Sequence, residues 1–83
     1  MAGKSKLPKK NIALAIRVDI FGMSQMDFAD TIGSYQALIS RWETVTGNIG
    51  AYKSMVKIRE AADRLGLDFI DTDFFEVRDA KGK

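Results

Sequence analysis

The side chains of this sequence whose types and spacing could do chemistry are amides, hydroxyls and a guanidinium group. Gln25 lies in one segment with helical spacing, and Gln36, Ser40 and Arg41 lie in the next. An interval of four residues, as between Gln36 and Ser40, places side chains on one face of a helix. Together these groups donate and accept hydrogen bonds. The chemistry that they suit is recognition of a polar surface.

Catalytic chemistry has little support in the sequence. The chain has no Cys and no His, which removes thiol nucleophiles, imidazole bases, disulfides and the usual zinc ligands. No pair of carboxylates is accompanied by a base, a nucleophile or a Gly-rich phosphate loop. Asp71-Thr72-Asp73 opens like a calcium loop, but the sixth position is Glu76 and no acid stands at the twelfth. We expect no enzyme activity, metal or cofactor.

Length and composition predict one small domain. The 83 residues suffice for a single core, and the 46% share of hydrophobic residues can fill it. No apolar run approaches the roughly 20 residues of a membrane span, so we expect no membrane association. The first apolar stretch is interrupted by Arg17 and Asp19 and lacks a signal-peptide cleavage site. These features favour a cytoplasmic protein.

Charge is distributed unevenly along the chain. The first 67 residues hold ten Lys or Arg and six Asp or Glu. Residues 1–10 form an expected flexible basic arm that includes Lys4 and Lys6, because Pro8 and the lack of an apolar period disfavour a helix there. Residues 68–83 form an acidic and aromatic tail. An anionic partner would therefore meet the first part of the chain.

Three helices are expected in the first half of residues 11–67. Ile12, Ile16 and Ile20 recur every four positions and predict a helix from Asn11 to about Gly22. Ser24-Gln25-Met26-Asp27 has the form of a capping box and begins a second helix, which Gly33 ends. With Ser34 as its N-cap, a third helix extends to Glu43. Its inward side chains are Leu38, Ile39 and Trp42.

The second half is predicted to hold a loop, a long helix and a tail. Residues 44–50 lack an apolar period and are expected to form a surface loop. Met55, Ile58, Ala62 and Leu65 predict a helix over residues 51–65, with Gly66 as its cap. The tail fits a short strand as well as a short helix. The predicted fold is all-α, a small bundle of four or five helices.

Residues 22–43 resemble the helix-turn-helix of the phage repressor and Cro-like (Xre-type) family. The matching features are the Gln at the start of the second helix, an apolar-Ala pair, an apolar-Gly turn and a late apolar-Glu pair, which here are Gln25, Phe28-Ala29, Ile32-Gly33 and Trp42-Glu43. The likeness extends more loosely over residues 11–67. Ser34 departs from the apolar residue usual in that turn, and the loop after Glu43 lacks the usual Lys or Arg and Pro. These departures weaken the expected phosphate grip of the loop.

The resemblance implies that the third helix enters the major groove of double-stranded DNA. Gln36 would contact bases, since Gln can pair with adenine through two hydrogen bonds, and Ala37 would touch a thymine methyl group. Arg41 would reach guanine or a phosphate. Gln25 would hold a phosphate. The other expected contacts are the flanking side chains of Tyr35 and Ser40, backbone hydrogen bonds from the loop residues Thr44, Thr46 and Asn48, and the arm residues Lys4 and Lys6.

The function implied by the resemblance is that of a transcriptional regulator, repressor-like and bacterial or phage-encoded. It would bind a short inverted repeat as a homodimer, because two-fold DNA sites match two-fold proteins. Phe69, Phe74 and Phe75 of the tail would then form a dimer contact or cover the core. The alternative is an antitoxin or adaptor whose tail binds a partner protein. A fragment of a larger enzyme is a third, weaker interpretation.

Overall fold

A computed structural model describes residues 11–77, and within them all regular structure is helical, as predicted. The expected basic arm, with Lys4 and Lys6, lies outside the described residues. Two helices continue directly into π-helical segments, and the tail contains a 3-10 helix. The elements are α1 (Ile12–Ala15) with η1 (Ile16–Phe21), α2 (Gln25–Ile32), α3 (Gln36–Arg41) with η2 (Trp42–Thr46), α4 (Tyr52–Leu65) and η3 (Asp71–Phe74).

Asn11 joins the start of α1 to the end of η2. Its side-chain oxygen accepts a hydrogen bond from the Leu14 backbone N–H at 2.9 Å, which caps α1. Its side-chain nitrogen donates to the carbonyl oxygen of Glu43 at 2.7 Å. The backbone N–H of Ala13 also donates to the carbonyl of Gly47, at 3.3 Å. One residue therefore both begins the first helix and holds the third.

The connection between α2 and α3 is short and tightly hydrogen-bonded. Ser24 caps α2 as predicted, accepting from the Asp27 backbone N–H at 3.1 Å. At the other end Gly33 has φ +73°, the left-handed conformation that glycine adopts without steric cost. The Ser34 backbone N–H then donates to the Ala29 carbonyl at 2.7 Å. The predicted N-cap of α3 was wrong by one residue: Tyr35 occupies it, without a side-chain cap.

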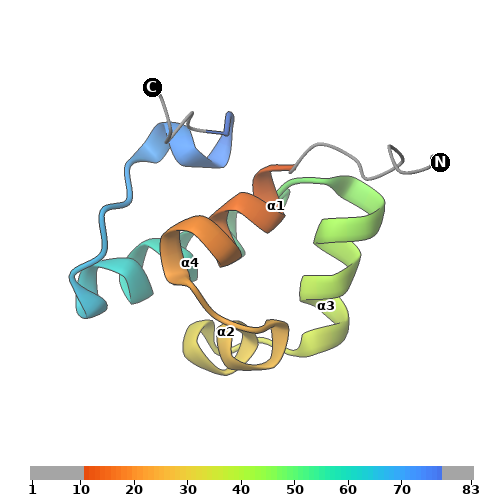
Figure 1. Cartoon of the computed structure of the whole chain (residues 1–83), viewed down its shortest axis with the longest axis horizontal. Coiled ribbons are helices and arrows are strands. Elements are labelled where there is room, and N and C mark those ends of the chain that lie inside the picture. Colours follow the sequence, from red (N-terminus) through yellow and green to blue (C-terminus); the bar gives the residue numbers. More distant parts are fainter. Residues whose placement is uncertain (1–10, 78–83) are drawn as a thin grey trace, which may run out of the picture.

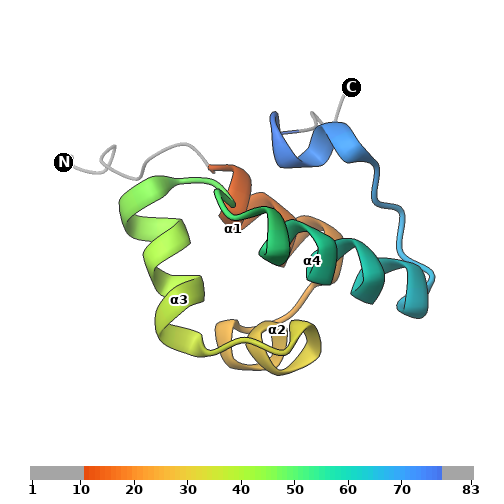
Figure 2. The same cartoon turned by 180° about the vertical axis from the view of Figure 1, so that it is seen from behind.

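The core is built from one large side chain of nearly every element. Phe28, Ile16, Ile39, Ile49 and Ile58 are its largest fully buried members. Phe28 also meets Phe21 edge to face, with ring centres 4.8 Å apart, a favourable aromatic arrangement. In Figures 1 and 2, α2 lies along one edge of the molecule and α3 stands at one end, so these two helices are exposed on their outer sides.

The predicted loop over residues 44–50 is wrong for its first part. The helix that begins at Gln36 continues through η2 to Thr46, and Gly47, at φ +77°, ends it. Ile49 follows and is 2% exposed, so this segment contributes to the core. Thr44, Val45 and Thr46 carry no helical apolar period, but the bond from Asn11 and the burial of Trp42 and Ile49 hold the backbone helical.

The described part of the tail forms a short helix rather than a strand. Phe74 is 6% exposed and belongs to the core, and Phe69 packs on it edge to face at 4.9 Å. Phe75 points away and is 67% exposed. Both views place η3 on the edge of the molecule opposite α2 (Figures 1 and 2). The tail thus closes the side of the core that α2 and α3 leave open.

Candidate functional site

A chain of four polar side chains connects the core to the surface between α2 and α3. Arg17 in η1 donates from Nε to Oε2 of Glu43 at 2.5 Å and from Nη2 to Oε1 at 3.1 Å. Gln25 Nε2 donates to the same Oε1 at 3.1 Å. Gln36 Nε2 donates in turn to Gln25 Oε1 at 3.2 Å. We call this set, Arg17, Glu43, Gln25 and Gln36, the polar relay.

The inner end of the polar relay is charged and mostly buried. The side chains of Arg17 and Glu43 are 15% and 8% exposed. Arg17 additionally donates from Nη1 to the Met23 carbonyl at 2.8 Å. Two-point pairing of a guanidinium with a carboxylate fixes the orientation of both groups. The ion pair is therefore a rigid base on which the two amides are arranged.

Donor and acceptor roles pass outward along the polar relay in one direction. An ionised carboxylate only accepts hydrogen bonds, so Gln25 must turn its NH2 group toward Glu43. Its carbonyl oxygen then faces Gln36 and accepts from the NH2 group there. Gln36 is exposed. It keeps its carbonyl oxygen and one N–H outside the polar relay, so this amide can donate and accept at once.

Most of the predicted contact residues on α3 share its outer face. Tyr35, Gln36, Ala37 and Arg41 are exposed and Ser40 is half-buried. Thr44 extends the same row by one turn because η2 continues the helix, and its hydroxyl donates to the Ser40 carbonyl at 2.9 Å. This outer row, comprising Gln36, Ala37, Ser40, Arg41 and Thr44, is a ridge of small and polar side chains on one straight element.

Two of the predicted loop residues, Thr44 and Thr46, lie in a helix, which changes the contacts that they can make. Backbone N–H groups within a helix donate to carbonyls of the preceding turn, so the amides of Thr44 and Thr46 are not offered outward as expected. Thr46 Oγ1 donates to the Asn48 carbonyl at 3.0 Å. The side chains of Thr46 and Asn48 are exposed. Any contact from these residues would come from side chains.

The three tail rings predicted to form a dimer contact or to cover the core differ in burial. Phe74 is buried in the core of its own chain, and Phe69 is partly buried against it. Phe74 therefore covers the core, and a dimer contact of the tail stays a prediction. Phe75 alone is exposed, at 67%.

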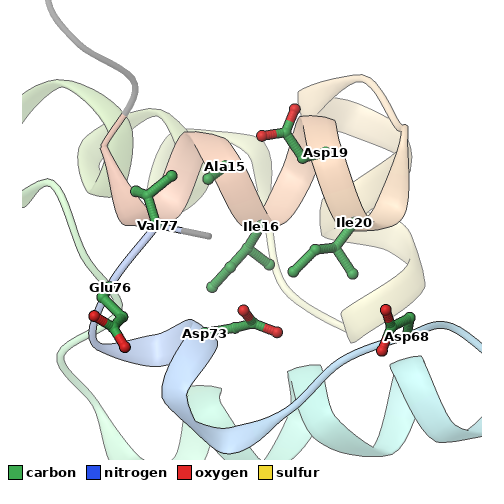
Figure 3. A pocket seen from close by; sticks show the side chains of 8 residues that line it. All are labelled: Ala15, Ile16, Asp19, Ile20, Asp68, Asp73, Glu76 and Val77. Carbon is green, nitrogen blue, oxygen red and sulfur yellow. The ribbon is translucent and has the colours of Figure 1, made fainter. Parts of the chain in front are cut away.

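A pocket of about 370 Å³ between η1 and the tail is rich in acid (Figure 3). Ile16 and Ile20 form its apolar floor. Its carboxylates belong to Asp19, Asp68, Asp73 and Glu76. Asp73, 4% exposed, accepts from the Ile70 backbone N–H at 2.9 Å and so closes the turn that begins η3. This pocket lies at the edge of the molecule opposite α2.

Arg17 is the one member of the polar relay that sequence reasoning missed. In the sequence Arg17 only interrupts an apolar stretch. Its position next to the buried Ile16 is nevertheless a signal, because a charge that is partly buried needs a partner. Glu43 was matched to the family pattern without a role. In the structure Arg17 and Glu43 form an ion pair, so each provides the counter-charge for the other.

Comparison with models of protein families, with curated proteins and with solved structures gives no match. Across residues 11–77 no helix is long and apolar enough to cross a bilayer. In the same range no group of three or more acidic side chains is arranged to hold a metal ion. The site must therefore be interpreted from its own geometry.

Proposed function

We propose that this chain binds double-stranded DNA in a sequence-specific way and regulates transcription, with α2 and α3 as a repressor-like helix-turn-helix. In this proposal α3 lies in the major groove and α2 lies across the backbone. A homodimer binds a short inverted repeat, with one half-site for each copy. No cofactor takes part.

The observation that carries the proposal is the orientation of the Gln36 amide by the polar relay. Recognition of adenine in the major groove requires one donor and one acceptor at a fixed separation, which the end of a Gln side chain supplies. A freely rotating amide would lose entropy on binding, whereas an amide held by Gln25 has already lost part of it. The buried Arg17–Glu43 pair supplies the fixed point from which this orientation is set.

The dimensions of the outer row fit this role. The continuous helix from Gln36 to Thr46 has 11 residues, about 16 Å at 1.5 Å per residue. A groove about 12 Å wide admits such a helix. Ala37 and Ser40 are small, which allows the backbone of α3 to approach base edges closely. Gln36 and Arg41 project farther and suit hydrogen bonds to them.

One cation lies on the outer row itself. Arg41 is exposed there and is available to a phosphate or a base. The acidic pocket near η3 lies at the opposite edge of the molecule. In this proposal Arg41 makes an ionic contact with the duplex from α3, and the acidic pocket stays away from the DNA.

Selection from a random-sequence duplex pool tests the proposal, followed by titrations of the enriched site at two salt concentrations. We expect a site with two-fold symmetry. Gln36→Ala should remove the preference at one base pair of each half-site, a loss of ~1–3 kcal/mol. Arg41→Ala should weaken binding and reduce the dependence on salt.

Arg59→Ala is the matched control for Arg41→Ala. It removes the same charge from an exposed position, but Arg59 pairs with Asp71 beside η3. We expect its affinity for a single half-site duplex, which one copy of the chain suffices to bind, to stay close to that of the wild type. The proposal fails if no site is enriched, or if weak, salt-sensitive binding is equally unaffected by Gln36→Ala and Arg41→Ala.

A further inference from the structure

The outer face of α4, which no described element covers, carries apolar side chains beside charged ones. Tyr52 is 78% exposed, and Val56 follows it one turn later on the same side. Figure 2 shows α4 on the near side of the molecule with no other element in front of it. An aromatic ring exposed to this extent beside further apolar side chains marks an interaction surface.

A groove of about 530 Å³ deepens this surface where α4 meets η3. Met55 and Val56 line one side, and Phe74 with the exposed Phe75 lines the other. Arg59 forms an ion pair with Asp71, and the exposed carboxylates of Glu60 and Asp63 also line the groove. The groove therefore combines apolar side chains with carboxylates.

Two exposed charges of opposite sign lie along one edge of this surface. Lys53 and Glu60 are seven residues apart, which is about two helical turns, so they occupy nearly the same edge of α4. Both are exposed, and neither forms an ion pair or hydrogen bond with another residue of the described range. Because the two charges are opposite, the same edge of an antiparallel second helix would place a Glu60 opposite each Lys53.

We propose that a second copy of the chain binds here, with the two α4 helices antiparallel across a two-fold axis near Val56. This axis is perpendicular to both helices. It reverses the direction of the second helix but keeps the edge that carries Lys53 and Glu60 on the same side of the interface in both copies. Lys53 of each copy then faces Glu60 of the other, and the two Val56 side chains meet at the centre. This interface is isologous, as two-fold dimers require. The inference rests on the proposed function in one respect: the dimer would provide the two copies of α3 that bind the two half-sites of the DNA.

The interface replaces the tail contact expected from the sequence. Phe75 is the tail ring that remains available, and it extends the apolar surface beside Val56. Another protein with a basic amphipathic helix would also find apolar contacts here. It would gain nothing from Lys53, however, whereas a second copy satisfies both Lys53 and Glu60.

Charge reversal with sedimentation equilibrium, carried out on the full chain without DNA, tests this interface. From low micromolar to submillimolar concentration we expect the wild type to pass from monomer to dimer. Lys53→Glu and Glu60→Lys should each weaken self-association about tenfold or more, because like charges then face each other. The double variant should self-associate as the wild type does.

Mixing the two single variants gives a still more specific result. In a mixed pair each reversed charge faces an opposite charge, so the mixture should form a heterodimer although neither variant dimerises well alone. Asp30→Lys is the matched control, since it reverses an exposed acid that belongs to α2 and not to the outer face of α4; it should leave the dimer unchanged. A wild type that stays monomeric, or single variants that associate as the wild type does, would overturn the proposal.

Failure of this interface is distinguishable from failure of DNA binding. The sedimentation measurement contains no nucleic acid and tests the α4 surface alone. A parallel titration of the wild type with a single half-site duplex, compared with Gln36→Ala, tests base reading without a dimer. The α4 interface is upheld if the charge-reversal pattern holds even when no duplex is bound. It is overturned if that pattern is missing even when the half-site is read.

Discussion

Glu43 has two acceptor oxygens and gives both of them to donors in the protein. Oε2 accepts from Arg17, and Oε1 accepts from Arg17 and from Gln25. Because the pair is largely removed from water, its desolvation has to be offset by these bonds. At the scale of single residues, the same carboxylate therefore stabilises the fold and sets the direction of the amides that lead to Gln36.

Glu43→Gln is expected to lower the free energy of unfolding by about 3 kcal/mol, since it leaves the guanidinium of Arg17 buried without a counter-charge. Urea unfolding measures this change. Asp71→Asn is the control, because it also breaks an Arg–carboxylate pair. That pair is exposed, with side chains 48% and 72% accessible, so its loss should cost less than about 1 kcal/mol. Equal effects of the two substitutions would contradict the role given to the buried pair.

At the scale of elements, the position of α3 depends on how α2 ends. Gly33 turns the chain through the left-handed region, and the bond from Ser34 to the Ala29 carbonyl closes the turn. This brings Gln25, at the start of α2, within hydrogen-bonding distance of Gln36, at the start of α3. The geometry of the amide pair is thus a consequence of one turn.

Gly33→Ala is expected to cost about 1–2 kcal/mol of stability, because an L-residue is strained in the left-handed region. A Cβ at this position would meet nothing within 4 Å, so the effect should come from the backbone alone. Gly50→Ala is the matched control. Its Cβ also meets nothing within 4 Å and its φ is not positive, so it should be neutral or stabilising. Thermal unfolding compares them, and a harmless Gly33→Ala would refute this explanation of the turn.

The elements also show which parts of the fold could be predicted from the sequence. Ser24 and Gly33 act through bonds with residues close to them in the chain, and their roles at the two ends of the second helix were predicted. The helical state of Thr44 was not, because it depends on Asn11, which binds the neighbouring Glu43 carbonyl from 32 residues away. The partnership of Arg17 with Glu43 was missed for the same reason, being a contact across 26 residues.

At the scale of the whole molecule, the chain has two chemically different edges. One edge presents α2, α3 and the end of the polar relay, while the opposite edge holds η3 and the acidic pocket. The tail belongs to the second edge and completes the core there through Phe74. The sequence pattern of the tail fits a short strand as well as a short helix, because packing on distant residues decides the conformation of the tail.

Phe74→Ala is expected to destabilise the protein by about 3 kcal/mol or more, as is usual when a buried ring is removed. Phe75→Ala, in the adjacent position, removes a ring that is 67% exposed and should change stability by less than about 0.5 kcal/mol. Urea unfolding at low micromolar concentration, where self-association is small, makes the comparison. A larger loss for Phe75 than for Phe74 would show that the tail packs differently.

The central claim is that Gln36, held in place by Gln25, reads a base, and a double-substitution cycle on DNA discrimination tests it most directly. The quantity measured is the loss of affinity when one A·T pair of the selected site is replaced, for wild type, Gln25→Ala, Gln36→Ala and the double variant. We expect the wild type to lose ~1–3 kcal/mol, Gln25→Ala to lose less, and Gln36→Ala and the double variant to lose almost nothing. If Gln36→Ala discriminates at every position of the site as well as the wild type does, the claim is contradicted.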